Sequence, residues 1–537
     1  MFAYVLIVVT IAIAISALAE RRNFQPALLV VMVGLAASYI PGIPLLELEP
    51  DFILTIVLPP MLFSAARDFS FADFRRRMGS IVNLGVFLVF ISTLAVGIAA
   101  LGVLPALLPI TALILGVVVA PPDAVAAIAI GRRAGLPVGL MTVLKGESLI
   151  NDAAALTLFA VLVAVATGTH AFIDNVPLYF LYAASVGIVV GLVIGNLAQL
   201  ARRLLASPAL ATAFSVIIPF AAYLLAEEFH ASGVLAVVAA GFAMGHHGVQ
   251  AGYEERMQEA GFWRTIDTLL ETFVFAYIGL QLRSVIADAN QAGFDTGELA
   301  LATLAIFLAL VATRFLWVFG SALAGRWRYR RLQARPGGPR DRRRLPAQPP
   351  LSWRENIVLA WTGMRGVVTL AAAAGTPLVV AGGAPFPGRE AIVSLAFLVT
   401  MTSLLVQGLT LPLLIGWLKL DDPGHDRFVA AQRARAEELT HAATEEALDA
   451  YASTHPGPQS ARLVSMMRQR FHAEQKMERP SGIDTAEALA IGKLLLETRR
   501  IRLVAARDNM ELDDTIVREM LEKLDLEQAF MDSVAEG

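Results

Sequence analysis

Long runs of apolar residues, each roughly 17–25 residues in length, recur along the chain as far as residue 420. An α-helix of about 20 apolar residues crosses the hydrocarbon core of a bilayer. Beyond residue 420 these runs stop and charged residues become frequent. The pattern therefore predicts an all-α, polytopic membrane protein: a membrane part over 1–420, followed by a helical tail over 421–537 outside the bilayer.

The composition excludes several classes of protein. Hydrophobic residues make up 56% of the 537 residues and charged residues only 17%, which is too little polar surface for a soluble chain. Cysteine is absent, so disulfides and cysteine-ligated metals are excluded. The chain has neither a GxxxxGK[ST] phosphate loop nor an HExxH zinc motif, and its net charge of −3 does not suit a nucleic-acid partner. We expect no enzyme activity and no cofactor.

The connections between the apolar runs alternate in positive charge. Basic connections stay in the cytoplasm, so the N-terminus is predicted outside and the tail inside. No positive charge precedes the first apolar run, which indicates a first span rather than a signal peptide. The basic connections hold Arg21–Arg22, Arg67 with Arg75–Arg77, Arg132–Arg133, Arg202–Arg203, Arg264 and the stretch 326–344. The thirteen predicted spans are 3–19, 25–40, 52–66, 79–100, 108–130, 138–168, 176–201, 208–226, 231–247, 262–287, 298–325, 353–381 and 388–418.

The tail carries apolar residues at helical spacing with charges between them, over 431–453 and 485–508. Its breaks contain proline and glycine, at 455–459 and 478–482. We expect a small helical domain. Three roles stay open for it: packing on its twin in a dimer, regulating the membrane part, or being only a solvated appendage.

Within the fifth span, Pro121 and Pro122 are followed by Asp123. Two prolines remove two backbone donors, so the helix must break there. Transporters build cation sites from the carbonyls that such a break frees inside the membrane. Asp123 is therefore a candidate cation ligand and, at the start of the second half-helix, also a candidate helix cap.

The sixth span carries four polar residues: Glu147, Ser148, Asn151 and Asp152. Ser148 and Asp152 lie four apart on one helical face, and Glu147 and Asn151 share the neighbouring face. Carboxylate, hydroxyl and amide oxygens are hard ligands suited to alkali cations, and ionisable residues at a helix centre are functional candidates. Asp152 can hold either a proton or a cation, which is the competition that an antiporter needs.

The twelfth span places Arg365 between Gly363 and Gly366. A buried arginine needs a partner, and Glu147 is the acid not required for cation binding. We predict a Glu147–Arg365 ion pair, with Arg314 of the eleventh span as the second candidate for that role.

Seven motifs carry a resemblance, in this order along the chain. They are ILTIVLPPMLFSAA (53–66), VVAPPDAVAAIAI (118–130), GESLINDAAALTLF (146–159), YLLAEEFHASGVLAVVAAG (223–241), FVFAYIGLQL (273–282), WTGMRGVVTLAAA (361–373) and LVTMTSLLVQGLTLPLL (398–414). The chain resembles the bacterial Na⁺/H⁺ antiporters of the monovalent cation:proton antiporter superfamily, in the branch that includes the animal Na⁺/H⁺ exchangers.

The resemblance implies about 13 helices in two inverted repeats, with a dimerisation part, a mobile core part and two broken helices that cross. It implies an elevator-type homodimer in the bacterial plasma membrane, with Asp152, Asp123 and Ser148 as cation ligands. The pair Asn151–Asp152 implies electroneutral exchange of one Na⁺ for one H⁺.

The chain departs from its relatives at Pro122, where many of them have threonine, so that only a backbone carbonyl is available at that position. The ligand oxygens suit Li⁺ and K⁺ as well as Na⁺, and K⁺/H⁺ exchange stays an alternative. A cation channel is less favoured, because channels use rings of carbonyls or charges rather than one titratable carboxylate.

Overall fold

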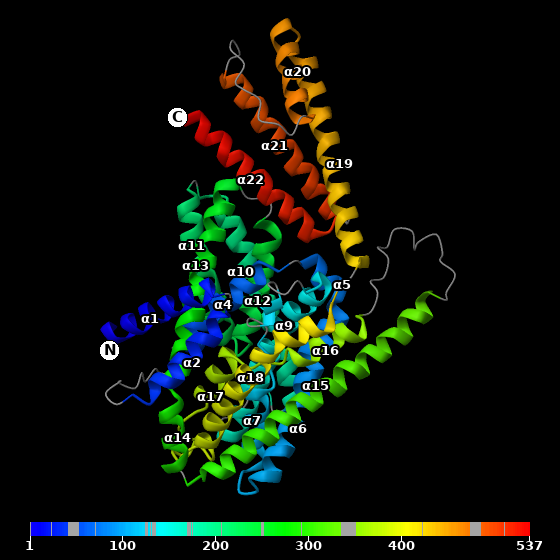
Figure 1. Cartoon of the computed structure of the whole chain (residues 1–537). Coiled ribbons are helices and arrows are strands. Elements are labelled where there is room, and N and C mark those ends of the chain that lie inside the picture. The colour runs from blue at the N-terminus through cyan, green and yellow to red at the C-terminus, as the bar shows by residue number, and fades with distance from the viewer. Residues whose placement is uncertain are drawn as a thin grey trace. The chain divides into compact units, whose positions relative to one another are not determined.

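A computed structural model of the chain (Figure 1) describes residues 2–536 apart from 23, 41–52, 70, 124–126, 129, 132–135, 169–172, 174, 206, 249–251, 292, 334–350, 421–422, 473–484 and 510. The described residues form helices and, in place of a sheet, one isolated β-bridge between Val379 and Pro385. The predicted all-α class is confirmed. Arg132–Arg133 and most of the basic stretch 326–344 lie outside the described residues.

The chain divides into two compact units: residues 1–246 with 259–421, and residues 422–537 with the short segment 247–258. The first unit holds α1 (Phe2–Arg21), α2 (Pro26–Ser38), η1 (Ile53–Val57), α4 (Leu58–Arg67), α5 (Phe71–Val82), η2 (Asn83–Phe87), α6 (Leu88–Val103), α7 (Pro109–Val119), α9 (Val138–Thr167), α10 (Val176–Arg202), α11 (Pro208–Glu228), most of α12 (Gly233–Gly248) and most of α13 (Tyr253–Leu280). It continues with α14 (Leu282–Gln291), α15 (Thr296–Gln333), α16 (Trp353–Trp361), α17 (Val367–Ala374) and α18 (Arg389–Leu418).

Among the residues that the structure describes, seven helices of the first unit are long and apolar enough to cross a membrane. The pair α13 and α14, bent by 44° at Gln281, adds an eighth if it is one span. Shorter apolar helices, including α2, α7 and α12, do not reach that length by themselves. The chain is therefore a multi-pass membrane protein, while the count of thirteen spans stays a prediction.

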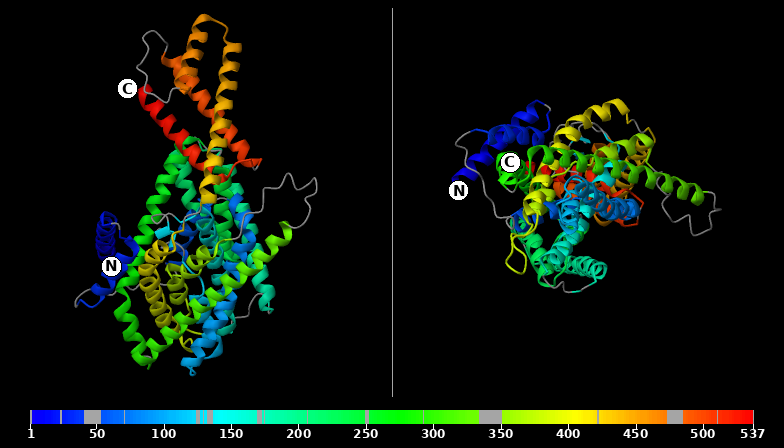
Figure 2. Two further views of the ribbon diagram at one scale, coloured as in Figure 1. Left: turned by 45° about the vertical axis from the view of Figure 1, so that its right-hand side comes forward. Right: turned by 90° about the horizontal axis from the view of Figure 1, so that it is seen from below.

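In the described part of the second unit, long helices lie side by side (Figure 2). They are α19 (Pro423–Thr454), α20 (Pro458–His472), α21 (Thr485–Asp508) and α22 (Asp514–Glu536). Leu439, Leu496, Leu503 and Val517 belong to a common apolar cluster. The amphipathic pattern predicted for this region thus corresponds to helices that bury one face against one another.

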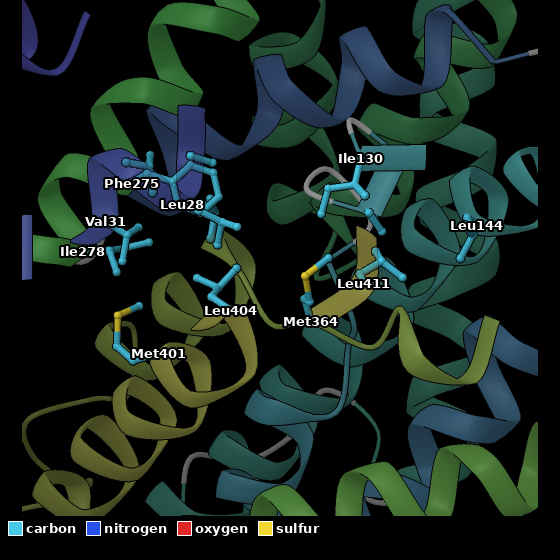
Figure 3. Close-up of a cluster of buried hydrophobic side chains, with 14 of the residues drawn as sticks. Leu28, Val31, Ile130, Leu144, Phe275, Ile278, Met364, Met401, Leu404 and Leu411 are labelled. Carbon is cyan, nitrogen blue, oxygen red and sulfur yellow. The ribbon is translucent and has the colours of Figure 1, made fainter. Parts of the chain in front are cut away.

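A large apolar cluster of the first unit encloses a stretch of non-helical backbone. Figure 3 shows Leu28 of α2, Phe275 of α13 and Leu404 of α18 around this cluster, together with Met364. Met364 lies between α16 and α17, where the helix is interrupted. Interrupted backbone is tolerated inside a membrane protein only where protein surrounds it or water reaches it, and here the apolar cluster forms part of the surrounding protein.

Helices α10 and α12 approach each other very closely. A β-carbon at Gly187 would lie 2.6 Å from the carbonyl oxygen of Ser232, and one at Gly191 would overlap the carbonyl of Ala236. Small residues at this spacing let two membrane helices pack backbone against backbone. The α10–α12 pair therefore forms a rigid frame beside α9.

Candidate functional site

The first broken span ends its first half at Val119, with Ala120 as the C-cap of α7. Pro121 and Pro122 follow and donate no backbone hydrogen bonds, which confirms the predicted break. The carbonyl oxygen of Pro122 accepts a hydrogen bond of 3.0 Å from the side-chain Nδ2 of Asn151 on α9. A side chain of the neighbouring helix thus replaces part of the backbone ladder that the prolines remove.

The second broken span consists of α16 and α17, with residues 362–366 between them. Its two sides are fixed by hydroxyl groups. Thr362 donates to the carbonyl of Leu359 at 3.0 Å, and Ser403 of α18 accepts a bond of 2.9 Å from the backbone N–H of Arg365.

The two breaks meet. The backbone N–H of Asp123 donates to the carbonyl of Met364 at 2.6 Å. The carboxylate of Asp123 lies against Gly366, the N-cap of α17, so closely that a β-carbon at Gly366 would overlap it. The N-terminal end of a helix carries partial positive charge. In the described residues, the helix end that Asp123 faces is therefore that of α17, rather than the one after its own prolines.

Arg365 compensates the opposite helix ends. Its Nε donates to the carbonyl of Val119 at 2.8 Å, its Nη2 to that of Ala120 at 3.3 Å, and its Nη1 to that of Gly363. These carbonyls belong to the C-terminal ends of interrupted helices, where the backbone lacks N–H partners and carries partial negative charge. At the crossing, where the two broken spans meet, the guanidinium of Arg365 thus lies against the freed carbonyls. The carboxylate of Asp123 lies against the N-terminal end of α17.

The predicted ion pair between Glu147 and Arg365 is wrong, and the second candidate, Arg314, takes its place. Arg314 of α15 donates to both carboxylate oxygens of Glu147, at 2.9 Å from Nη2 to Oε2 and in a shorter contact from Nη1 to Oε1. Its Nε donates to the carbonyl of Leu359 at 3.1 Å. Arg365 is bound instead by the carbonyls that the helix breaks leave free.

Asp152 has a different environment from Glu147, although both lie on α9 and both are buried. The residue is only 7% exposed. Within the part of the chain that the structure describes, it has neither a hydrogen bond nor an ion pair, and the charged group that acts on it is Asp123. An isolated buried carboxylate is very unfavourable when ionised. Asp152 therefore requires a proton or a cation from outside the chain.

Two further predicted ligands, Asn151 and Ser148, lie on α9 within about one helical turn of Asp152. Asn151 is fully buried, and its amide oxygen has no partner among the described residues. Ser148 is half-buried one helical turn before Asp152. Asn151 donates to the carbonyl of Pro122, and Asp123 is the next residue along the chain. The structure thus brings the predicted residues to one region, and their roles as cation ligands stay predictions.

Sequence reasoning missed a buried triad at the ends of three helices. Glu259 of α13 accepts from Arg202 of α10 at 2.7 Å and lies 3.2 Å from Nη1 of Arg67 of α4. Both arginines had been assigned only to the charge of the connections. A charge near a span end gives no sign in the sequence of whether it is solvated or paired, so the pattern could not identify the triad.

Comparisons with known proteins agree with this geometry. Residues 6–417 match the family model described as the transmembrane sodium/hydrogen exchanger. The chain belongs to the sodium/hydrogen exchanger family. An uncharacterised Na⁺/H⁺ exchanger of Mycobacterium tuberculosis is 30% identical, over 98% of this chain and 96% of that protein. The Na⁺/H⁺ antiporter ApNhaP of Aphanothece halophytica is also 30% identical, over 88% of this chain and 84% of that protein.

Among solved structures, the sodium proton antiporter MjNhaP1 from Methanocaldococcus jannaschii, determined at pH 8, has the same fold. The TM-score is 0.59 at 19% identity, over 78% of this chain and 99% of that one. The predicted family and the function of sodium/proton exchange are confirmed, and the family is one of transporters rather than enzymes.

Proposed function

We propose that the exchanger transports Na⁺ or Li⁺ against H⁺ by letting the two ions compete for Asp152. The observation that carries this proposal is the contrast on α9: Glu147 has a bidentate arginine partner, while Asp152, which is also buried, has no donor among the described residues. A carboxylate without a fixed partner is free to exchange one cation for another.

The cycle that follows uses residues at the crossing. Asp152 binds Na⁺ together with oxygens of Asp123, Ser148 and Asn151 and the carbonyl of Pro122. Protonation of Asp152 removes its charge and releases the cation. Asn151 keeps the broken backbone in place through its Nδ2 donor, which leaves its amide oxygen available to the ion.

The same arrangement supports electroneutral exchange. Asp123 lies at the N-terminal end of α17, Glu147 is paired with Arg314, and Arg365 is bound by carbonyls. Of these acids, Asp152 is the one without a partner in the described residues, and we propose that it carries the exchange of one Na⁺ for one H⁺.

The larger-scale mechanism that we propose is an elevator movement in a homodimer, with the N-terminus outside and the tail in the cytoplasm of a bacterium. The alternation of basic connections supports the orientation. The family resemblance and the two interrupted spans support the movement, since alternating access carries a site built from broken helices from one side to the other.

The test is Na⁺-driven proton movement in proteoliposomes, comparing the parent protein with Asp152→Asn. We expect the substitution to abolish exchange, because an amide can neither be protonated nor balance a cation. Asp288→Asn, at an exposed carboxylate of α14, is the matched control and should exchange ions at the parent rate. Full exchange by Asp152→Asn would falsify the proposal.

K⁺/H⁺ exchange is the second candidate. A Bacillus pumilus relative, 29% identical over 72% of this chain and 57% of that protein, is named a sodium, potassium, lithium and rubidium/H⁺ antiporter. A panel of alkali cations in the same assay separates the two: we expect Na⁺ and Li⁺ to support faster exchange than K⁺, and equal rates would overturn that preference.

A further inference from the structure

A buried hydrogen bond joins the site-bearing helix α9 to the beginning of α12. The hydroxyl groups of Thr157 and Ser232 lie 2.9 Å apart, and both residues are buried. Thr157 also donates to the carbonyl of Ala153 at 2.7 Å, the residue directly after Asp152. The contact thus lies about 7–8 Å along α9 from Asp152, towards the C-terminal end of the helix.

Ser232 is held in a rigid frame. Its hydroxyl caps α12 by accepting from the backbone N–H of Leu235 at 3.3 Å, and its own N–H donates to the carbonyl of Ala183 on α10 at 3.0 Å. The preceding turn contains His230 at a φ of 53°, a left-handed conformation that a residue with a side chain adopts only when the surrounding structure fixes it. Together with the close α10–α12 packing, these contacts leave Ser232 little freedom to follow a displacement of α9.

The contacts of α9 on the two sides of Asp152 differ in strength. Towards the N-terminal end, Glu147 and Arg314 form a buried bidentate ion pair, and breaking such a pair is very unfavourable. Towards the C-terminal end, Thr157 and Ser232 share a neutral hydroxyl bond, a type of interhelical contact that shifts an equilibrium by only about threefold on average in a membrane protein. The Thr157–Ser232 bond can therefore break in each transport cycle, whereas the Glu147–Arg314 ion pair cannot.

We propose that Thr157 and Ser232 form a latch that closes the ion site towards the C-terminal end of α9 and opens when α9 moves. The latch rests on the proposed exchange cycle, in which the site must be closed on one side while it is open on the other. Thr157 acts as a positioning residue, since it touches neither the cation nor the proton. The Glu147–Arg314 pair keeps α15 attached to α9 in both positions.

Thr157→Val removes the hydroxyl and keeps the size of the side chain. Because the latched state loses a bond that the open state never had, we expect the open state to gain about threefold in population. The apparent Na⁺ affinity should then rise when Na⁺ is offered on the latch side and fall when it is offered on the other side. Thr157→Ser keeps a hydroxyl and should restore the parent values. Thr303→Val is the matched control: it removes a buried hydroxyl that, among the described residues, bonds the carbonyl of Leu299 within its own helix α15.

A second readout does not depend on transport. The chain has no cysteine, so Ala231→Cys provides a single reactive group at a buried position beside the latch. A membrane-impermeant maleimide should modify this cysteine about threefold faster in the Thr157→Val background than in the parent or Thr157→Ser background. Vesicles of the two orientations identify the side from which the reagent enters.

The outcomes separate the latch from the proposed function. Unchanged modification rates together with unchanged Na⁺ affinities on both sides, in a correctly inserted Thr157→Val protein, would overturn the latch. Faster modification in a protein that exchanges no Na⁺ would support the latch and contradict the ion assignment. Should Thr157→Val fail to insert, Ser232→Ala removes the partner hydroxyl and should give the same increase in modification.

Discussion

The crossing of the broken spans and the helical tail both contain buried charges, but they compensate these charges in different ways. In the tail, Asp525 of α22 accepts from Arg256 at 2.9 Å and from Arg500 at 2.8 Å, so that side chains compensate one another between intact helices. In the crossing, Arg365 is bound by three backbone carbonyls and Asp123 faces the N-terminal end of α17. There the interrupted backbone supplies the partners.

The difference is one reason why we propose an ion site at the crossing and none in the tail. Paired side chains satisfy one another and leave no charge for an external ion. Where the backbone compensates the fixed charges, a further carboxylate such as Asp152 can stay without a partner in the described part of the chain and bind a transported cation. The ion pair Glu147–Arg314 lies beside this region, but its two side chains compensate each other, as those of the tail do. It therefore gives the clearest contrast with Asp152 inside the membrane part.

Removing one partner of that buried pair should have the largest effect. Glu147→Gln leaves the guanidinium of Arg314 buried without its carboxylate, and we expect a loss of about 3–5 kcal/mol in stability. Thermal unfolding in detergent measures this loss. The double substitution Glu147→Met with Arg314→Met replaces both charges by apolar groups and should recover most of it. A double variant as unstable as the single one would show that the pair does not behave as an ordinary buried ion pair.

Moving Asp123 away from α17 should have the next largest effect. Gly366→Ala places a β-carbon where the carboxylate of Asp123 lies, so the Asp123 side chain must move away from the N-terminal end of α17. A displacement of about 1 Å at a functional centre lowers rates by as much as about 100-fold, and we expect a loss of this order in proteoliposome exchange.

Gly320→Ala on α15 is the control for that substitution, because a β-carbon there meets nothing within 4 Å. It should leave the exchange rate at the parent value. Equal exchange by Gly366→Ala and Gly320→Ala would mean that the contact between Asp123 and α17 has no part in transport.

The sequence predicted which residues form the site better than it predicted which residues they contact. Pro121–Pro122 identify the first break because proline lacks a donor, and the four-residue spacing of Ser148 and Asp152 places them on one face of α9. The partner of Glu147 could not be predicted, because Arg314 lies 167 residues away and both arginines are mid-span charges of the same type. Only the three-dimensional arrangement shows that the freed carbonyls bind one arginine and leave the other to the carboxylate.

Thr157 and Ser232 were missed for a related reason. A threonine inside an apolar helix normally bonds to a carbonyl of its own preceding turn, and Thr157 does so with Ala153. The sequence therefore gives no sign of a second, interhelical bond.

In the tail, Asp525→Asn tests whether paired side chains stabilise as the comparison requires. The amide accepts weaker bonds from Arg256 and Arg500, and we expect a loss of about 2 kcal/mol, measured by hydrogen exchange of α21 and α22. Asp449 pairs with Arg468 at 2.7 Å, but its side chain is 73% exposed. Asp449→Asn should therefore change the stability measured by hydrogen exchange by about 1 kcal/mol or less. Equal losses of stability in Asp525→Asn and Asp449→Asn would show that burial does not increase the contribution of an ion pair in the tail.

The smallest effect is expected from Asp532, at the edge of the tail's charge network. The ammonium of Lys493, at 2.7 Å, and the hydroxyl of Tyr253 lower the pKa of Asp532 below its usual value. A carboxylate with a lowered folded pKa stabilises the tail above its unfolded pKa, about 3.9, and this contribution disappears as the pH falls through the folded value. Asp532→Asn should therefore speed hydrogen exchange of α22 slightly between about pH 5 and about 8, and the two proteins should converge as the pH falls below the folded pKa of Asp532. A difference that grew towards low pH would show that Asp532 is less favourable when ionised than when neutral, and that Lys493 and Tyr253 do not compensate its charge.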